Sequence, residues 1–172
     1  MKKIIMIVVT MLSVLILTAC GAAQSVSEGT AGVAKAIFVW DVRTLHLDYS
    51  ARAELNTDDK NRSSPVVIRM YQLSDAKSFE AATYPLLVND DRDLLGSSLL
   101  ATKEIVLKPN SSISVDTAFD KDAQYVGIMA LFKEPDLKQN NWRILLKRRD
   151  LNINKPREII ANKFALELIA ED

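Results

Sequence analysis

The sequence predicts a mainly β fold: a β-sandwich of two sheets with a short helical insertion between the second and third strands. Apolar and polar residues alternate with a period of two along most of the chain beyond residue 44, which places successive side chains on opposite faces of a strand. Short segments rich in turn-forming residues separate these alternating stretches. Many short strands separated by turns are typical of a two-sheet sandwich. We therefore expect residues 34–172 to form one β-sandwich domain.

The first predicted strand displays the alternation clearly, because Leu45, Leu47 and Tyr49 alternate with polar residues. A strand with one buried face has this pattern. The segment 125–132 is instead almost entirely apolar, as expected for a strand that is covered on both faces. The predicted strands lie within residues 45–52, 66–71, 104–108, 112–119, 125–132, 142–147 and 164–168.

The predicted insertion lies where the alternation is lost. Residues 74–83 and 90–100 do not follow the period of two, and we expect one short helix in each segment. Ser74 is a candidate N-cap for the first helix, because its hydroxyl can accept a backbone N–H. Gly96 can end the second helix, because glycine adopts the positive φ that helix C-termini often require.

The composition excludes several classes of function. Lys and Arg together number 22, as do Asp and Glu, so the formal net charge is zero. A nucleic-acid-binding protein normally has a basic excess, and a disordered chain has a large net charge with few apolar residues. One Cys excludes an internal disulfide framework or a zinc site of several thiolates, and one His excludes most histidine-based metal clusters. We expect no nucleic-acid partner and no metal.

The first 19 residues predict a bacterial lipoprotein signal peptide. Lys2 and Lys3 precede an uncharged and mostly apolar segment, residues 4–18. This segment is short for a permanent membrane span, which needs about 20 residues. Ala19 then precedes Cys20, the only cysteine, and this pattern resembles the lipobox of bacterial lipoproteins.

The lipobox resemblance implies cleavage before Cys20, a diacylglycerol on its sulfur and an acyl group on its new amine. An uncleaved short anchor with an incidental cysteine is the alternative. Gly21 rather than Asp follows the cysteine, which in lipoproteins of this kind implies delivery to the outer membrane. Residues 20–33 would then be the lipidated cysteine and a tether, because residues 24–32 are mostly small or polar.

We identify no catalytic residue, and we expect neither an enzyme nor a protein with a small-molecule substrate or an organic cofactor. Nucleophilic catalysis needs a nucleophile beside a positioned base, and the only imidazole, His46, lies on the polar side of its predicted strand. The loop that starts at Asn56 resembles a calcium loop in its first positions. However, Asn61 occupies the position of the required Gly, and Val67 that of the bidentate Glu. Carboxylate pairs that only folding would bring together stay open.

One basic cluster, Lys147-Arg148-Arg149, allows two interpretations. Charged residues at the end of a strand discourage pairing between sheet edges. The same cations could instead contact lipid headgroups or an acidic partner. The sequence alone favours the first interpretation, because it requires nothing beyond the strand itself.

The segment Leu55 to Leu73 resembles the type VI secretion lipoprotein family known as TssJ, VasD or SciN. In that family an Asn-containing loop leads into a strand with the pattern Ser/Ala-Pro-Val-Val-x-Arg-x-Tyr-x-Leu, which residues 64–73 match. The resemblance extends over roughly residues 43–169. Two positions depart from the family, since Asn61 and Asn110 stand where Gly is common. Asn tolerates positive φ better than other non-Gly residues, so we expect both turns to be kept.

The resemblance implies an outer-membrane lipoprotein whose transthyretin-like sandwich faces the periplasm as part of the secretion membrane complex. Its partner would be the periplasmic C-terminal region of the inner-membrane protein TssM, contacted by the loop between the first two strands. Here that loop comprises Asn56, Thr57, Asp58, Asp59, Lys60, Asn61, Arg62, Ser63 and Ser64. The alternatives are an ordinary solvated loop and, for the whole protein, a lipoprotein that binds a small ligand or a glycan.

Overall fold

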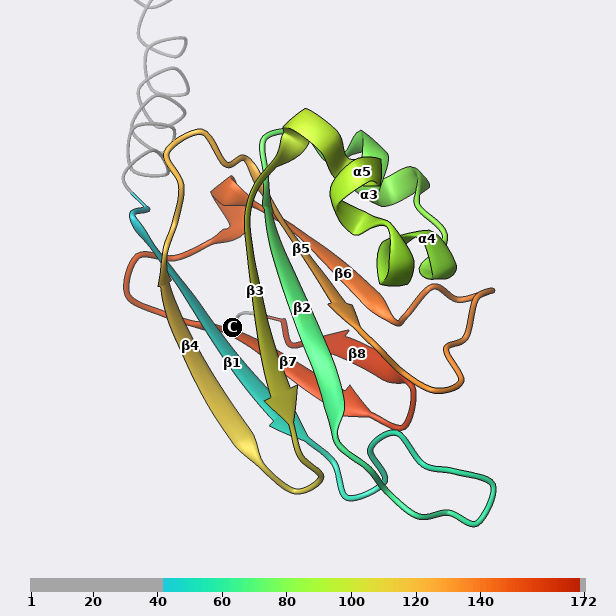
Figure 1. Ribbon diagram of the computed structural model, residues 1–172. Coiled ribbons are helices and arrows are strands. Elements are labelled where there is room, and N and C mark those ends of the chain that lie inside the picture. The colour runs from blue at the N-terminus through green and yellow to red at the C-terminus, as the bar shows by residue number, and fades with distance from the viewer. Residues whose placement is uncertain (1–41, 171–172) are drawn as a thin grey trace, which may run out of the picture. The chain divides into compact units, whose positions relative to one another are not determined.

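A computed structural model describes residues 42–170, which form two four-stranded β-sheets packed face to face with a helical insertion on one of them (Figure 1). The strand order is β4-β1-β7-β8 in the first sheet and β3-β2-β5-β6 in the second. Among the described residues no helix has the length and apolar character needed to cross a membrane. The strands are β1 (Thr44–Ala51), β2 (Val66–Leu73), β3 (Leu99–Leu107), β4 (Ser112–Ala118), β5 (Tyr125–Ala130), β6 (Arg143–Lys147), β7 (Arg157–Asn162) and β8 (Ala165–Leu168).

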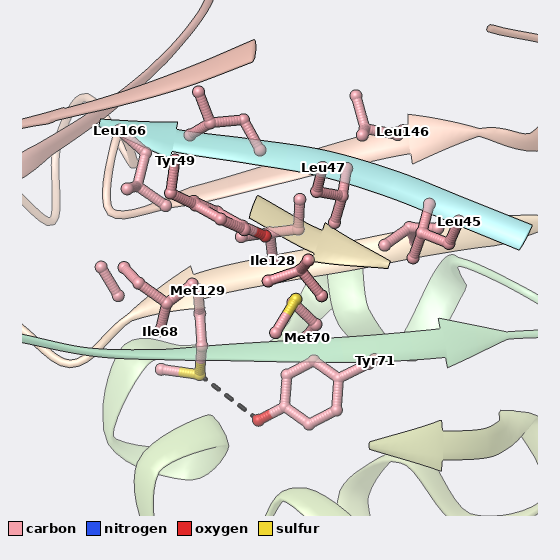
Figure 2. Close-up of a cluster of buried hydrophobic side chains, with 14 of the residues drawn as sticks. Leu45, Leu47, Tyr49, Ile68, Met70, Tyr71, Ile128, Met129, Leu146 and Leu166 are labelled. Atoms are coloured by element: carbon pink, nitrogen blue, oxygen red, sulfur yellow. Dashed lines mark hydrogen bonds between the residues drawn. The ribbon is translucent and has the colours of Figure 1, made fainter. Parts of the chain in front are cut away.

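The core lies between the two sheets and confirms the alternation (Figure 2). Leu45, Leu47 and Tyr49 of β1 are each only 1% exposed, and the inward residues Val66, Ile68 and Met70 of β2 are 1%, 0% and 3% exposed. Burying one such side chain contributes about 1.5–3 kcal/mol. The predicted mainly β sandwich is therefore correct. The predicted signal peptide, Cys20, the tether and the first residues of the predicted domain, 34–41, lie outside the described residues.

One strand was not predicted: β7, which pairs in parallel with β1. Its inward residues are Arg157, Ile159 and Ala161. An arginine and an alanine do not make a recognisable apolar face, and Ile160 interrupts the alternation from the solvent side. The strand forms because its backbone pairs with β1. Nothing in the sequence of residues 157–162 predicts that pairing.

The helical insertion is present, but it differs from the prediction in number and position. It contains α3 (Lys77–Ala81), α4 (Tyr84–Asn89) and α5 (Asp91–Leu95), followed by a 3-10 turn, Gly96–Ser98. The prediction of two helices was wrong, because Pro85 opens a further helix, as proline can in a first turn. Gly96 ends α5 at φ 49°, as expected.

Two details of the predicted helices were also wrong. Ser74 is not the N-cap of α3: the cap position is Ala76, and the carboxylate of Asp75 accepts the N–H of Lys77 at 2.8 Å. Leu99 and Leu100 belong to β3 rather than to a helix. Leu99 pairs with Leu73 at the end of β2, and Leu100 is the extra residue at the register shift between Gln72 and Leu73.

The insertion covers part of the outer face of the second sheet and is held there by aromatic and cationic contacts. Phe79 of α3 packs edge-on against Tyr71 of β2, with ring centroids 5.9 Å apart, and also lies directly on Gly127 of β5. Arg143 of β6 donates to the carbonyls of Phe79 and Ala82 at 2.6 and 2.9 Å. The central strand β5 is therefore covered on both faces, as its apolar sequence predicted.

The contact between Phe79 and Gly127 generates a stability prediction. A Cβ at position 127 would lie 2.8 Å from Cε2 of Phe79, closer than any normal contact. Gly127→Ala should therefore destabilise the fold by about 1–3 kcal/mol, the usual cost of overpacking, as measured by urea unfolding. Phe79→Leu supplies the control: if the clash is the cause, the double variant should be clearly more stable than the sum of the two single effects predicts. Strict additivity would contradict the explanation.

Candidate partner-binding surface

The connection between β1 and β2, residues 52–65, projects from one end of the sandwich (Figure 1). Val42, where the chain enters the described sandwich, lies at the other end. The two ends are separated by the full length of β1, which has eight residues and therefore spans roughly 26 Å at about 3.3 Å per residue. We call residues 52–65 the β1–β2 loop.

The base of the loop is built around Asn56, which is only 3% exposed and has a φ of 47°. Its side-chain amide donates to the carbonyl of Pro65 at 3.1 Å and accepts the N–H of Lys133 at 2.9 Å. Its backbone N–H donates to the carbonyl of Lys163 at 2.8 Å. Thr57 beside it is 9% exposed. Both residues are among the predicted partner contacts, yet the fold uses them to fix the loop from below.

The tip of the loop is closed by Asp58. Its carboxylate accepts the backbone N–H groups of Lys60 at 2.9 Å and Arg62 at 3.0 Å, and the Nε of Arg62 at 2.8 Å. Asn61 has a φ of 56°, so the turn in which Asn replaces the family's Gly is kept, as predicted. The second such turn is kept as well, because Asn110 has a φ of 55°.

Charge and hydrogen bonding together hold the Asp58 carboxylate in its ionised form. The side chain of Arg62 lowers the pKa of Asp58 most, and the N–H groups of Arg62 and Lys60 lower it further. Ser63 and Ser64 also bond back to the loop base, through the carbonyls of Ala53 at 2.6 Å and Asn56 at 2.7 Å. The loop is therefore ordered before any partner arrives.

The residues that remain available on the loop surface carry both signs of charge. Asp59, Lys60, Asn61, Arg62 and Ser63 are exposed. Neither Asp59 nor Lys60 makes an ion pair with any residue of the described part of the chain. Sequence reasoning placed all of residues 56–64 at the surface. The one feature of the sequence that could have indicated burial is the apolar Leu55 directly before them, which is fully buried in the structure.

The basic cluster at the end of β6 is divided between the interior and the surface. Arg148 is 7% exposed, and its guanidinium donates to the carbonyls of Ala123 at 2.7 Å and Val42 at 2.9 Å while lying over the ring of Phe119. Lys147 and Arg149 are exposed. Arg148 therefore ties strand ends together and is not available to a lipid headgroup.

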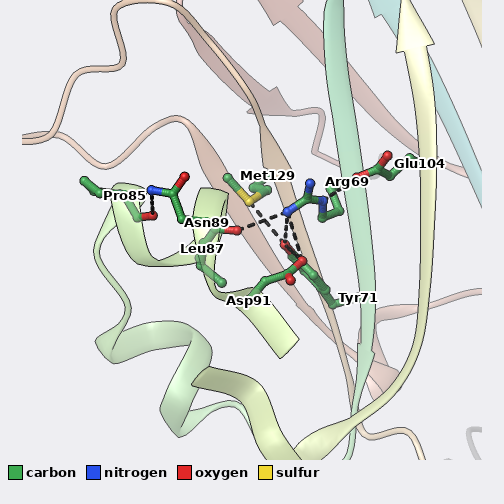
Figure 3. Close-up of polar contacts among 8 residues, drawn as sticks. All are labelled: Arg69, Tyr71, Pro85, Leu87, Asn89, Asp91, Glu104 and Met129. Atoms are coloured by element: carbon green, nitrogen blue, oxygen red, sulfur yellow. Dashed lines mark hydrogen bonds and ion pairs between the residues drawn. The ribbon is translucent and has the colours of Figure 1, made fainter. Parts of the chain in front are cut away.

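A second polar cluster connects the helical insertion to the second sheet (Figure 3). Arg69 of β2 pairs with Asp91 of α5 at 2.9 Å and with Glu104 of β3 at 2.5 Å, and donates to the carbonyl of Leu87 at 3.1 Å. Tyr71 donates to the same Asp91 at 3.0 Å, and burial raises the pKa of its hydroxyl. Arg69, Asp91 and Glu104 of this cluster line a hollow of about 410 Å³, and both carboxylates are ion-paired with Arg69.

Other candidate chemical groups are dispersed. His46 contacts Asp116 across β1 and β4 at 2.5 Å, on the solvent side of the first sheet. Asp48 and Glu158 line a smaller hollow of about 230 Å³ on the same side. Within residues 42–170 no group of three or more His, Cys, Asp or Glu side chains is placed to hold a metal ion.

A model of the type VI secretion lipoprotein family, described by the names VasD, EvfM and TssJ, matches residues 43–169. The chain belongs to this family. A comparison of the sequence with curated proteins gives no match.

Solved structures agree with the family and with the fold. A chain of a structure described as a type VI membrane complex is 38% identical, with a TM-score of 0.73, and the match covers 76% of this chain and 100% of that one. A chain of a structure described as the T6SS protein TssM C-terminal domain (869-1107) from EAEC is 37% identical, with a TM-score of 0.68 and the same coverage. The crystal structure of the T6SS lipoprotein TssJ1 from Pseudomonas aeruginosa, 20% identical, has a TM-score of 0.63 over 76% and 97% of the two chains.

The lowered pKa of Asp58 predicts how the loop responds to acid. A carboxyl whose pKa is lower in the folded state stabilises the fold above its unfolded value and loses that contribution as the pH falls through the folded pKa. The carboxyl carbon of Asp58 should therefore titrate in NMR with a midpoint below the ordinary 3.8. Arg62→Ala should raise this midpoint, whereas Arg52→Ala, at an exposed arginine of the same loop, should not. An unchanged midpoint in Arg62→Ala would refute this account.

Proposed function

We propose that the protein is a lipid-anchored component of the type VI secretion membrane complex that binds the periplasmic C-terminal region of TssM and so couples the two membranes. The observation that carries the proposal is the separation of the two ends of the sandwich. The described sandwich begins with Val42 at one end, and an ordered, mixed-charge loop projects at the other (Figure 1). Cys20 precedes Val42 in the sequence. A protein anchored at one end and docked at the other transmits force between its two attachments.

The anchor in this proposal is Cys20. Residues 1–19 act as its signal peptide, residues 20–33 as the tether and residues 34–172 as the periplasmic domain. Family membership supports a covalent lipid, and the diacylglycerol and N-acyl group would give one residue three chains. Each buried methylene contributes about 0.8 kcal/mol, so that three chains anchor the protein far more firmly than one. The absence of Asp after Cys20 supports the outer membrane as its location.

The partner in this proposal is TssM. This lipoprotein-family chain matches one chain in a structure described for the TssM C-terminal domain and another in a structure described as a type VI membrane complex. Both matches cover the whole of the other chain. Such matches are expected if lipoproteins of this family occur together with TssM in those assemblies.

The mechanism is mechanical rather than catalytic. The Asn56 and Asp58 contacts order the loop in the free protein, so less conformational entropy is lost when a partner docks. Confinement of both proteins to facing membranes raises their effective concentration, so that a modest affinity suffices. Exposed charges on Asp59 and Lys60 would then set the rate and salt dependence of association more than the final affinity.

The larger hollow on the surface gives no specific support to the alternative of a ligand-binding or hydrolytic sandwich. A glycosidase needs one carboxylic acid and one carboxylate free to act on the substrate. In the larger hollow Asp91 and Glu104 are both paired with Arg69. We therefore propose a non-enzymatic protein without a small-molecule substrate.

The anchor is tested by removing its sulfur. A Cys20→Ser chain, given a signal peptide whose cleavage does not need a lipid, should move from the membrane fraction to the soluble periplasm. Labelled palmitate should be incorporated by the wild-type chain and not by the variant. Secretion should stop, although the sandwich should melt at the same temperature. Full secretion by the soluble variant would exclude an anchoring role.

The loop is tested by exchanging the charges of Asp59 and Lys60 at its tip. The double variant Asp59→Lys/Lys60→Asp keeps the net charge and should slow association with the purified periplasmic region of TssM several-fold at low ionic strength, with a smaller difference at high salt. Lys121→Asp/Asp122→Lys is the matched control, because these exposed neighbours lie at the Val42 end, where Arg148 binds both Lys121 and Val42. Equal association rates for all three proteins would place the contact away from the loop.

A further inference from the structure

The outer face of the second sheet is only partly covered by the helical insertion. Helices α3 to α5 lie over the part of the sheet that carries Tyr71 and Gly127. The part of β2 and β3 that leads toward the β1–β2 loop has no helix in front of it (Figure 1). The side chains of β2 and β3 that point outward from this uncovered part, those of Val67 and Val106, are apolar.

Three residues on neighbouring strands form this bare surface. Val67 of β2 pairs directly with Val106 of β3, and Leu131, just after β5, donates its backbone N–H to the carbonyl of Val67 at 2.9 Å. Val106 is 53% exposed, while Val67 and Leu131 are half-buried. We call Val67, Val106 and Leu131 the apolar row.

The apolar row lies between two polar regions. Two residues further along the paired strands, Arg69 faces Glu104 and begins the charged cluster under α5. In the other direction, exposed Pro65 leads into the β1–β2 loop. The row is therefore bordered by charge and is continuous with the loop along the chain.

Val106 is an exposed apolar residue on a strand at the edge of its sheet. β3 is an edge strand, because it pairs only with β2 in its sheet. Edge strands with exposed apolar residues invite contact with other chains, and natural proteins place charges there instead. Thr102 and Glu104 follow that rule on the same face of β3, and Val106 departs from it.

The β1–β2 loop is also too small to bind a partner stably without help. Specific interfaces bury about 800 Å² on each partner and involve about 20–30 residues a side. The loop exposes nine residues, 52–54, 59–63 and 65, and buries Asn56 and Thr57. Interfaces combine an apolar centre with a polar rim, and the loop supplies only the polar part.

We infer that the apolar row is the apolar part of the same interface, receiving apolar side chains of the periplasmic C-terminal region of TssM while the β1–β2 loop contacts its charged surface. This inference rests on the proposed function. The continuity of the row with the loop and the missing interface area select this partner over an unrelated one.

The test substitutes Val106 with charges of both signs and measures affinity for the purified periplasmic region of TssM. Val106→Asp and Val106→Lys should each weaken binding about tenfold or more, because either charge would be buried without a partner. Ile153→Asp and Ile153→Lys are matched controls at an exposed isoleucine in the connection between β6 and β7, 39% exposed, and should bind as wild type. Circular dichroism and melting temperature establish that each variant folds.

The possible outcomes separate this inference from the proposed function. If both Val106 variants bind TssM as tightly as the wild type does, the inference is overturned and TssM remains the partner. If the wild-type protein does not bind TssM, the inference and the proposed function are both overturned. If a Val106 variant fails to fold, methyl NMR of the wild-type complex decides instead: Val67 and Val106 signals must shift on binding. A wild-type dimer that Val106→Asp dissociates would assign the row to self-association and contradict the inference.

Discussion

The side chain of Asn56 is the constraint on which the candidate site depends, because it joins separate connections at one end of the sandwich. Its amide bonds to Pro65 and to Lys133, and its backbone bonds to Lys163. Each bond contributes about 0.5–1.5 kcal/mol, and a buried group left unsatisfied costs about 1–3 kcal/mol. The loop tip that Asp58 organises can therefore project from a fixed base. Order at the tip follows from burial at the base.

Three arginines are partly or fully buried and connect elements of the sandwich through hydrogen bonds and ion pairs. Arg148 donates to backbone carbonyls at one end, Arg143 to the last carbonyls of α3, and Arg69 to carboxylates and a carbonyl under α5. Arginine suits these places because its planar group offers several fixed donors and stays charged. Their cations hold strand ends and helices in position, so these three arginines are used within the fold.

The two faces of the second sheet contact different parts of the protein. Its inner face packs against the first sheet through residues such as Ile68, and this packing makes the sandwich rigid. Its outer face is divided between the helical insertion and the apolar row near the loop. A rigid body with its entry point and its candidate binding surface at opposite ends suits a protein that must carry load between two membranes.

The sequence by itself determined the sandwich and the two turns where Asn61 and Asn110 take positive φ. These features depend on neighbouring residues, since alternation and turn preference are local properties of the chain. Lipid attachment at Cys20 stays a prediction, because Cys20 lies outside the described residues. Only the tertiary structure decided the parallel pairing of β7 with β1, the burial of Asn56 and the inward role of Arg148. Arg148 and Val42 are 106 positions apart in the sequence. Contacts of that kind depend on which distant segments the fold brings together, and the sequence around each residue does not predict them.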